Sequence, residues 1–470
     1  MALTVDTERP AGLAEEIEFI PESERAGSPR TLAGAWSGVL VAPGTLVTGI
    51  VAAGGAKGPG FSWAAIGLTI GIMLGAAGVA WISTFGPPWG LGTMTIGSFA
   101  FGWANVAPIV ALLFSLACYN ALTDNFAASA LDDAFGTPFV FAAAAVFVLE
   151  VGVIAFRERI MRVGGIAVTA GVLVVVAFAL YGIFDQGVHP YNGPADNPNL
   201  AGQVLTAIAL GLSMSITWGV QACDLSRTLP AKTSRRSVLV WVFLGMSIPL
   251  IALGLLGAYV STAQAINDPL GRLYDVIGGG LIADGALIVL CFSFVLANGL
   301  NDYSAGLGLQ NIGVPVSRVF GSLIFAFFAL SLAFVFHLTP LGSLTSDVLL
   351  IAGYYTVCWF GVVIVELWLR RSEASPWVKS PVSPGAALAA FIGALLILLP
   401  FSATSVGNQI AADSSAFAWV GIVSRELLSG GGLGYEAGAI ASALLYGIFR
   451  GLSLWNQSRR SADKSRALES

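Results

Sequence analysis

Residues 34–50 read GAWSGVLVAPGTLVTGI, an apolar stretch interrupted in its middle by Pro43 and Gly44. Proline removes a backbone donor and clashes with the preceding turn, so it breaks a helix. A second interrupted stretch, ALGLSMSITWGVQACD (209–224), carries several polar or small residues: Ser213, Ser215, Thr217, Gly219 and Gln221. Paired broken helices in corresponding places of two halves are typical of secondary transporters, with a binding site at the membrane midplane. The alternative is a proline kink with ordinary packing of small residues.

The composition of the chain is typical of a polytopic membrane protein. Of its 470 residues 56% are hydrophobic and 10% are charged, against about 25% charged in soluble domains. Mean hydropathy is +0.81. A run of about twenty apolar residues crosses the bilayer as a helix, and the 57 glycines favour close packing between such helices. We expect an all-α polytopic protein with about twelve spans, at roughly 32–54, 62–84, 99–122, 138–155, 165–184, 202–222, 237–261, 279–300, 319–337, 346–369, 384–403 and 435–450.

The distribution of basic residues predicts the topology. With the N-terminus inside, nineteen of the 22 Lys and Arg residues fall on the inner side, and only Lys57, Arg272 and Arg425 fall outside. Positive charge concentrates on the cytoplasmic side of membrane proteins. We therefore expect cytoplasmic tails at 1–31 and 451–470, in a multi-pass protein of the cell (inner) membrane. The acidic N-terminal segment lacks the pattern of a cleaved signal peptide.

Several motifs go beyond composition. NGLNDYSAGLGLQ (298–310), followed by Arg318, resembles the N-x-x-[ND]-x-YSxGLxLQ...R segment of purine–cytosine permeases, members of the nucleobase–cation symporter family. TWGVQACDLSRTLPAKTSRRSV (217–238) resembles that family's GWxxYxxDYSRYLPxxTSRRxV. The family's N-terminal entry segment resembles IEFIPESERAGSP (17–29). Its tenth span resembles GYYTVCWFGVVIVELWLRR (353–371), and its last span resembles GGGLGYEAGAIASALLYGIFR (430–450).

The resemblance implies a five-plus-five inverted repeat of the LeuT-like kind, with broken helices 1 and 6. The repeats would be 32–184 and 202–370, with two more helices in 384–450. It also implies symport of a nucleobase or a relative such as hydantoin or allantoin, coupled to Na⁺ or H⁺, without a cofactor. The partners it implies are the small heterocycle and the lipid bilayer, with neither a nucleic acid polymer nor an obligate protein partner.

Substrate-binding candidates follow from the same motifs. The resemblance assigns Trp218 to stacking on the substrate ring and Asn298 to its polar edge. A flat base needs an aromatic face, and amides carry both a donor and an acceptor. Asn301, one turn after Asn298, and Gln221, three residues after Trp218, are further amide candidates. Helix–helix hydrogen bonding is the alternative role for the asparagines.

Span three departs from the family. Alignment on AASAL (127–131) puts Tyr119 and Thr123 where the family has a tryptophan and an amide. The two residues share a helix face, being four apart. Tyrosine can still stack, but threonine cannot replace an amide, so we expect these positions to affect the choice of substrate.

Two kinds of coupling ion remain open. Sodium-coupled relatives use carbonyls at the break in span one, here Val39 to Pro43 with Val39 and Ala42 as the named candidates, and hydroxyls in span eight, here Ser293 alone. Hard cations need several oxygen ligands, whereas a proton needs only a carboxylate with a suitable environment. The carboxylate candidates are Glu150, Asp124 and Asp284. Glu366 is a weaker candidate because Arg370, four residues on, can neutralise it.

Two other functions compete with nucleobase import. The same fold could carry amino acids, whose carboxylate often binds at a broken-helix N-terminus; the paired asparagines and Trp218 argue against this. A membrane enzyme is a remote alternative, suggested by Asp132 and Asp133, since aspartate pairs can hold a metal diphosphate. One pair without further acids at helical spacing is a weak motif.

Overall fold

The computed structural model describes residues 20–338, 341–370 and 383–469, and these form helices joined by turns and loops, with no strand among them. The α-helices of the first half are α1 (Arg30–Leu40), α2 (Pro43–Ala53), α3 (Gly60–Ser83), α4 (Gly86–Trp89), α5 (Thr93–Phe101), α6 (Val106–Phe135), α7 (Phe139–Ala155) and α8 (Arg157–Asp185). Those of the second half are α9 (Leu200–Ile216), α10 (Ala222–Ser226), α11 (Arg235–Val260), α12 (Pro269–Ile277), α13 (Gly280–Asn311), α14 (Arg318–His337) and α15 (Leu341–Leu369). The last four are α16 (Pro384–Leu398), α17 (Ser405–Asp413), α18 (Ile422–Leu427) and α19 (Gly434–Glu469).

The membrane-spanning character of the chain is confirmed. Within the described residues ten helices are long and apolar enough to cross a bilayer, and α1 with α2 makes an eleventh as one bent span. The remaining expected span, the fourth at 138–155, is the apolar helix α7, which has 17 residues and is therefore short for a full crossing. The division into repeats at 32–184 and 202–370 stays a prediction.

The first span is broken where the proline predicts. Helices α1 and α2 meet at 66°. Val41 and Ala42 leave the helical conformation, and Pro43 opens α2, where its missing N–H costs nothing. The same proline cannot donate to the Val39 carbonyl four residues earlier, so the break leaves that oxygen without its usual helical partner.

The sixth span is interrupted more gently. Between α9 and α10 the residues Thr217–Gln221 form a 3₁₀ segment, and the helix continues without a sharp bend. The hydroxyls explain why. Thr217 Oγ1 donates to the Ser213 carbonyl at 2.8 Å, and Ser215 Oγ donates to the Leu212 carbonyl at 3.1 Å. Both hydroxyls thus form hydrogen bonds to carbonyls of their own helix, and the backbone there stays close to helical.

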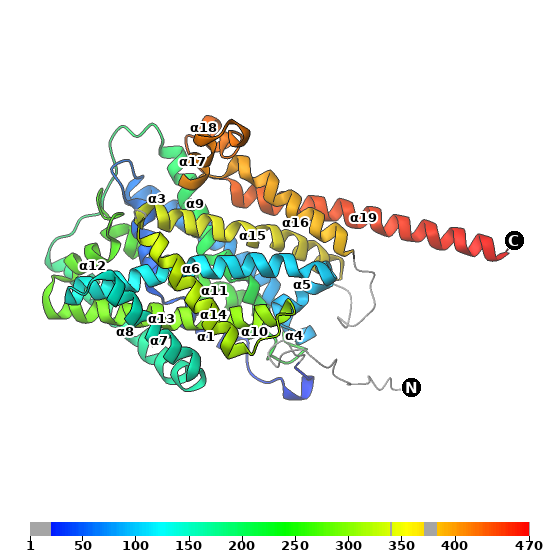
Figure 1. The fold of residues 1–470 in the computed structure, drawn as a ribbon, viewed down its shortest axis with the longest axis horizontal. Coiled ribbons are helices and arrows are strands. Elements are labelled where there is room, and N and C mark those ends of the chain that lie inside the picture. Colours follow the sequence, from blue (N-terminus) through cyan, green and yellow to red (C-terminus); the bar gives the residue numbers. More distant parts are fainter. Residues whose placement is uncertain (1–19, 339–340, 371–382, 470) are drawn as a thin grey trace.

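The helices pack as two groups. The broken-helix group contains α1, α2, α3, α9, α10 and α11, in which α3 packs against α9 and α11, and α11 packs against α1 and α2. The polar-helix group contains α6, α7, α13 and α14, each packed against the other three. Helix α15 contacts both groups through α9 and α6. Figure 1 shows α16 beside α19, which extends far beyond the rest of the protein.

Glycines permit the close approaches within the broken-helix group. A Cβ added to Gly71 of α3 would lie 2.0 Å from the Ile208 carbonyl of α9, and one added to Gly257 of α11 would lie 2.0 Å from the Leu46 carbonyl of α2. Only glycine allows the backbones to come this near. The high glycine content therefore serves helix packing, as the composition predicts.

Candidate substrate and coupling site

Asn298 of α13 is the centre of a buried polar cluster, with 1% of its surface exposed. Its amide nitrogen donates to Asp124 Oδ1 of α6 at 2.7 Å and to Glu150 Oε1 of α7 at 2.8 Å. Its amide oxygen accepts from the Thr123 hydroxyl at 2.5 Å. Three helices of the polar-helix group thus meet at one amide.

A second amide extends the cluster along the same helices. The Asn120 nitrogen donates to Asp302 Oδ1 at 2.7 Å, and its oxygen accepts from Asn301 at 2.8 Å. Asp302 is fully buried, and Asn120 is 1% exposed. We name the seven residues together the amide–carboxyl cluster: Asn120, Thr123, Asp124, Glu150, Asn298, Asn301 and Asp302.

The three carboxyls of this cluster are not neutralised by any ion pair that the described residues make. Within the described part of the chain neither lysine nor arginine pairs with Asp124, Glu150 or Asp302. Asp124 Oδ2 and Asp302 Oδ2 are buried without any hydrogen bond. Neighbouring carboxylates repel one another strongly in a buried place, and burying each charge costs further free energy. Such groups are costly to keep in a membrane and mark functional sites.

The aromatic candidates lie on the other group. Trp218, half-buried in the 3₁₀ segment, meets Trp36 of α1 edge to face, with ring centroids 6.3 Å apart. Trp36 is buried, and its indole N–H has no hydrogen-bond partner. Both interrupted spans therefore contribute an indole to one place. Gln221 ends the same 3₁₀ segment and is half-buried.

Tyr119 lies between the two groups. It stands one turn before Thr123 on α6, and its hydroxyl lies near Ser213 of α9 and Thr217 of the 3₁₀ segment. That hydroxyl is buried and makes no hydrogen bond. Its ring packs against both main hydrophobic cores of the protein. Tyr119 is thus the cluster's neighbour that faces the broken-helix group.

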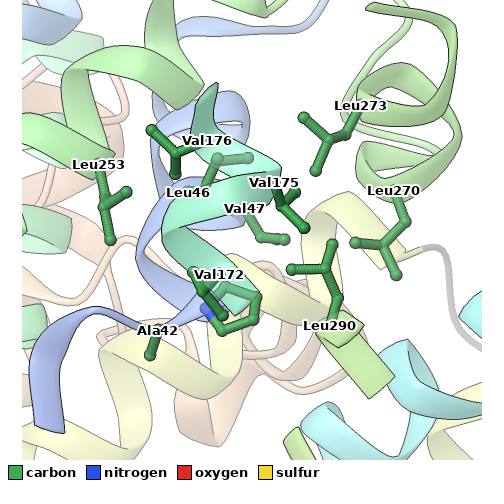
Figure 2. A pocket seen from close by; sticks show the side chains of 11 residues that line it. Ala42, Leu46, Val47, Val172, Val175, Val176, Leu253, Leu270, Leu273 and Leu290 are labelled. Carbon is green, nitrogen blue, oxygen red and sulfur yellow. The ribbon is translucent and has the colours of Figure 1, made fainter. Parts of the chain in front are cut away.

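One of the expected sodium ligands, Ala42, lines an apolar cavity. Figure 2 shows the side chains of Ala42 and Leu290 at this cavity, together with leucines and valines of α2, α8, α11 and α12. Ser293 follows Leu290 by one turn and is buried. The complete lining is hydrocarbon: Ala42, Pro43, Leu46, Val47, Val172, Val175, Val176, Leu253, Leu270, Leu273 and Leu290.

Other candidates lie away from the cluster. Asp284 is on α13, fourteen residues before Asn298 and so about 21 Å away along the helix. Asp132 and Asp133 are exposed near the end of α6. Glu366 of α15 pairs with Arg370 at 2.7 Å, as the four-residue spacing predicts.

Sequence reasoning missed Asn120, Asp302 and Trp36. The first two had a readable signal: Asn120 precedes Asp124 by four residues, and Asp302 follows Asn298 by four, so each pair shares a helix face. Trp36 had none, because a tryptophan in an apolar span is ordinarily packing.

Comparisons with known proteins agree with this architecture. Residues 19–413 match the family described as permease for cytosine/purines, uracil, thiamine, allantoin. The purine-cytosine permease FCY21 of Saccharomyces cerevisiae is 25% identical over 285 residues, covering 55% of this chain and 51% of that protein. The vitamin B6 transporter TPN1 of the same yeast is 24% identical over 332 residues, covering 65% of this chain and 56% of that protein. The chain thus spans about half the length of the curated relatives it matches.

Solved structures show the same fold. Inward-facing Mhp1 superposes with a TM-score of 0.69 at 17% identity, covering 95% of each chain. Mhp1, a nucleobase-cation-symport-1 family transporter, in a closed conformation with bromovinylhydantoin bound gives 0.66 at 16% identity, covering 94% of this chain and 96% of that one. The LeuT-like fold expected from the sequence is confirmed by this likeness.

Proposed function

Because the chain belongs to the family of permeases for cytosine/purines, uracil, thiamine and allantoin, we propose that it imports a nucleobase or related heterocycle by symport and alternating access. The family is one of multi-pass membrane permeases and not of enzymes. The protein would lie in the cell (inner) membrane with both termini in the cytoplasm, as its basic residues favour.

The observation that carries this proposal is the buried Asn298 amide. It lies in the motif that resembles the family's substrate segment, and Thr123 of the facing helix reaches it at 2.5 Å. An amide of this kind can pair with the alternating donors and acceptors on a base edge. Asn301 is held one turn away through Asn120 and can extend the same polar edge.

The aromatic part of the proposed site is Trp218, with Tyr119 opposite on α6. Stacking of a base on an aromatic side chain contributes about 1–3 kcal/mol. Trp36 holds the Trp218 ring edge to face and so favours one orientation of the indole. Gln221, three residues after Trp218 in the same 3₁₀ segment, is the remaining amide candidate.

Protons are the proposed coupling ion. The amide–carboxyl cluster places Asp124 and Glu150 directly on the proposed substrate amide. The sodium alternative needs Val39, Ala42 and Ser293 to supply oxygens. The cavity that Ala42 lines is otherwise surrounded by hydrocarbon side chains, whereas a hard cation binds several oxygen ligands. The relatives leave the heterocycle open, with allantoin, hydantoin and vitamin B6 as alternatives to cytosine and purines; an amino acid remains a further alternative.

Uptake by proteoliposomes tests the proposal. Purified protein is reconstituted and given radiolabelled cytosine, adenine, uracil, allantoin, hydantoin, pyridoxine or leucine under a proton gradient, a sodium gradient or neither. We expect accumulation of one heterocycle, driven by an inwardly directed proton gradient and absent from Asn298→Ala. Accumulation of leucine alone, or of no heterocycle under any gradient, would refute it.

A further inference from the structure

Both donor hydrogens of the Asn298 amide are already used inside the protein. A carboxamide nitrogen carries two hydrogens, and here one goes to Asp124 and the other to Glu150. The amide oxygen accepts from Thr123. A heterocycle that needs a donor from Asn298 must therefore displace one of the two carboxyls. Substrate and carboxyl compete for the same amide.

The two carboxyls depend on that amide because no lysine or arginine among the described residues pairs with them. Their oxygens lie within 2.8 Å of a single nitrogen, so the two groups are near neighbours in a buried place. A donor between two carboxylates relieves their repulsion. When one of them takes up a proton, its new O–H can donate to the other carboxylate, and the amide is no longer needed between them.

We propose that Asp124 and Glu150 form one proton-binding site, and that protonation of this site releases the Asn298 amide to bind the heterocycle. The inference rests on the proposed function and supplies its coupling step. On the outer side, a proton adds to one carboxylate oxygen and the amide turns to the substrate. On the inner side, the proton leaves, the carboxylates reclaim the amide, and the substrate is expelled. One proton then moves with each heterocycle.

A second observation indicates which oxygen can accept the proton. Asp124 Oδ2 is buried and has no hydrogen bond, although Oδ1 of the same carboxyl is engaged. Asp302 holds Asn120 at 2.7 Å and so acts as a positioning residue, because Asn120 in turn holds Asn301. Among the described residues, the titratable groups near the pair are Asp302 and Cys291 of α13. Tyr119 lies on α6 itself, but its hydroxyl is near Ser213 and Thr217 of the facing span. Helix α14, packed against all three, carries Arg318 and His337 at its two ends.

Calorimetry on the full-length protein tests this. The probe is cytosine, or the heterocycle with the highest uptake if cytosine is not carried. Binding is measured at a series of pH values in two buffers with different ionisation enthalpies. We expect uptake of about one proton per bound molecule, and a dissociation constant that rises about tenfold per pH unit in the alkaline range.

Variants separate the site from its surroundings. Glu150→Gln makes one carboxyl permanently neutral, so it should still bind the probe but lose the proton uptake and most of the pH dependence. Asp284→Asn is the matched control, on α13 but outside the cluster, and should retain both. Wild-type binding without proton uptake, at an affinity independent of pH, would overturn the inference while leaving the proposed function intact. Absence of binding and uptake for every heterocycle would instead refute the proposed function.

Discussion

Glu366 holds two buried arginines from different helices, and its removal should be costly. Its Oε1 accepts from Arg370 Nε at 2.7 Å, while Oε2 accepts from Arg450 Nε at 3.2 Å and from the Tyr446 hydroxyl at 2.7 Å. Arg370 and Arg450 are 3% and 4% exposed. This network joins α15 to α19 and so ties the last helix to the transporter core.

The change Glu366→Gln removes the charge with little change in shape. It leaves two buried guanidinium groups without their carboxylate, and breaking a buried ion pair in this way costs about 3–5 kcal/mol. Tyr446→Phe is the matched comparison, because it deletes one hydrogen bond to a charged group, about 1.5–3 kcal/mol, and keeps both ion pairs. Thermal unfolding of the purified protein in one detergent should therefore rank wild type above Tyr446→Phe, and Tyr446→Phe above Glu366→Gln.

A double variant sharpens the prediction. Arg450→Gln removes one of the two guanidinium groups that Glu366 binds, so Glu366→Gln combined with Arg450→Gln should lose less stability than the two single losses added together. If Glu366→Gln melts at or above Tyr446→Phe, or if the two single losses simply add, the network is not the electrostatic tie that its geometry indicates.

The remaining predictions concern the proposed site and the helix packing around it. Trp218→Ala should raise the dissociation constant of the heterocycle about 5- to 150-fold, from the loss of about 1–3 kcal/mol of stacking, whereas Trp218→Phe should keep most of the affinity; equal binding by both and by wild type would remove Trp218 from the site. Asn298→Ala should abolish concentrative uptake while the protein still elutes as a folded species on size-exclusion chromatography. Ser293→Ala should leave uptake and its response to sodium unchanged in proteoliposomes, and a loss of sodium stimulation would revive the sodium alternative. Gly71→Val should prevent accumulation of folded protein, because its side chain would run into the Ile208 carbonyl, and normal yield and melting would contradict the packing argument.

The sequence correctly predicts the sharp break in span one, but it predicts a larger break in span six than the structure has. Pro43 interrupts span one because a missing N–H and a ring clash are local properties that no tertiary contact can remove. The hydroxyls of span six are different, because Ser215 and Thr217 can bond back to their own helix, and they do so. Their presence therefore predicts an irregular segment but not its size.

The polar cluster was only half predictable, for a related reason. The sequence points to Asp124 and Glu150 through their positions alone, and to Asn298 and Thr123 through the resemblance to the family. That they meet at one amide depends on how α6, α7 and α13 cross, which residue spacing on a single helix does not encode. Asp302 was within reach of the four-residue rule, whereas the edge-to-face contact of Trp36 with Trp218 requires the two broken spans to be placed side by side.

The proposed recognition elements are divided between two bodies. The amide–carboxyl cluster belongs to the polar-helix group, and the indoles of Trp36 and Trp218 lie on the two interrupted spans of the broken-helix group. Under the proposed function a heterocycle contacts both the amides and the indoles only when the two helix groups approach each other. Its measured affinity therefore includes the free energy of that conformational change. A ligand that fits the amides but carries a bulky substituent over its flat face would keep the two helix groups apart. Such a molecule would bind without being carried, which makes this division a starting point for designing inhibitors.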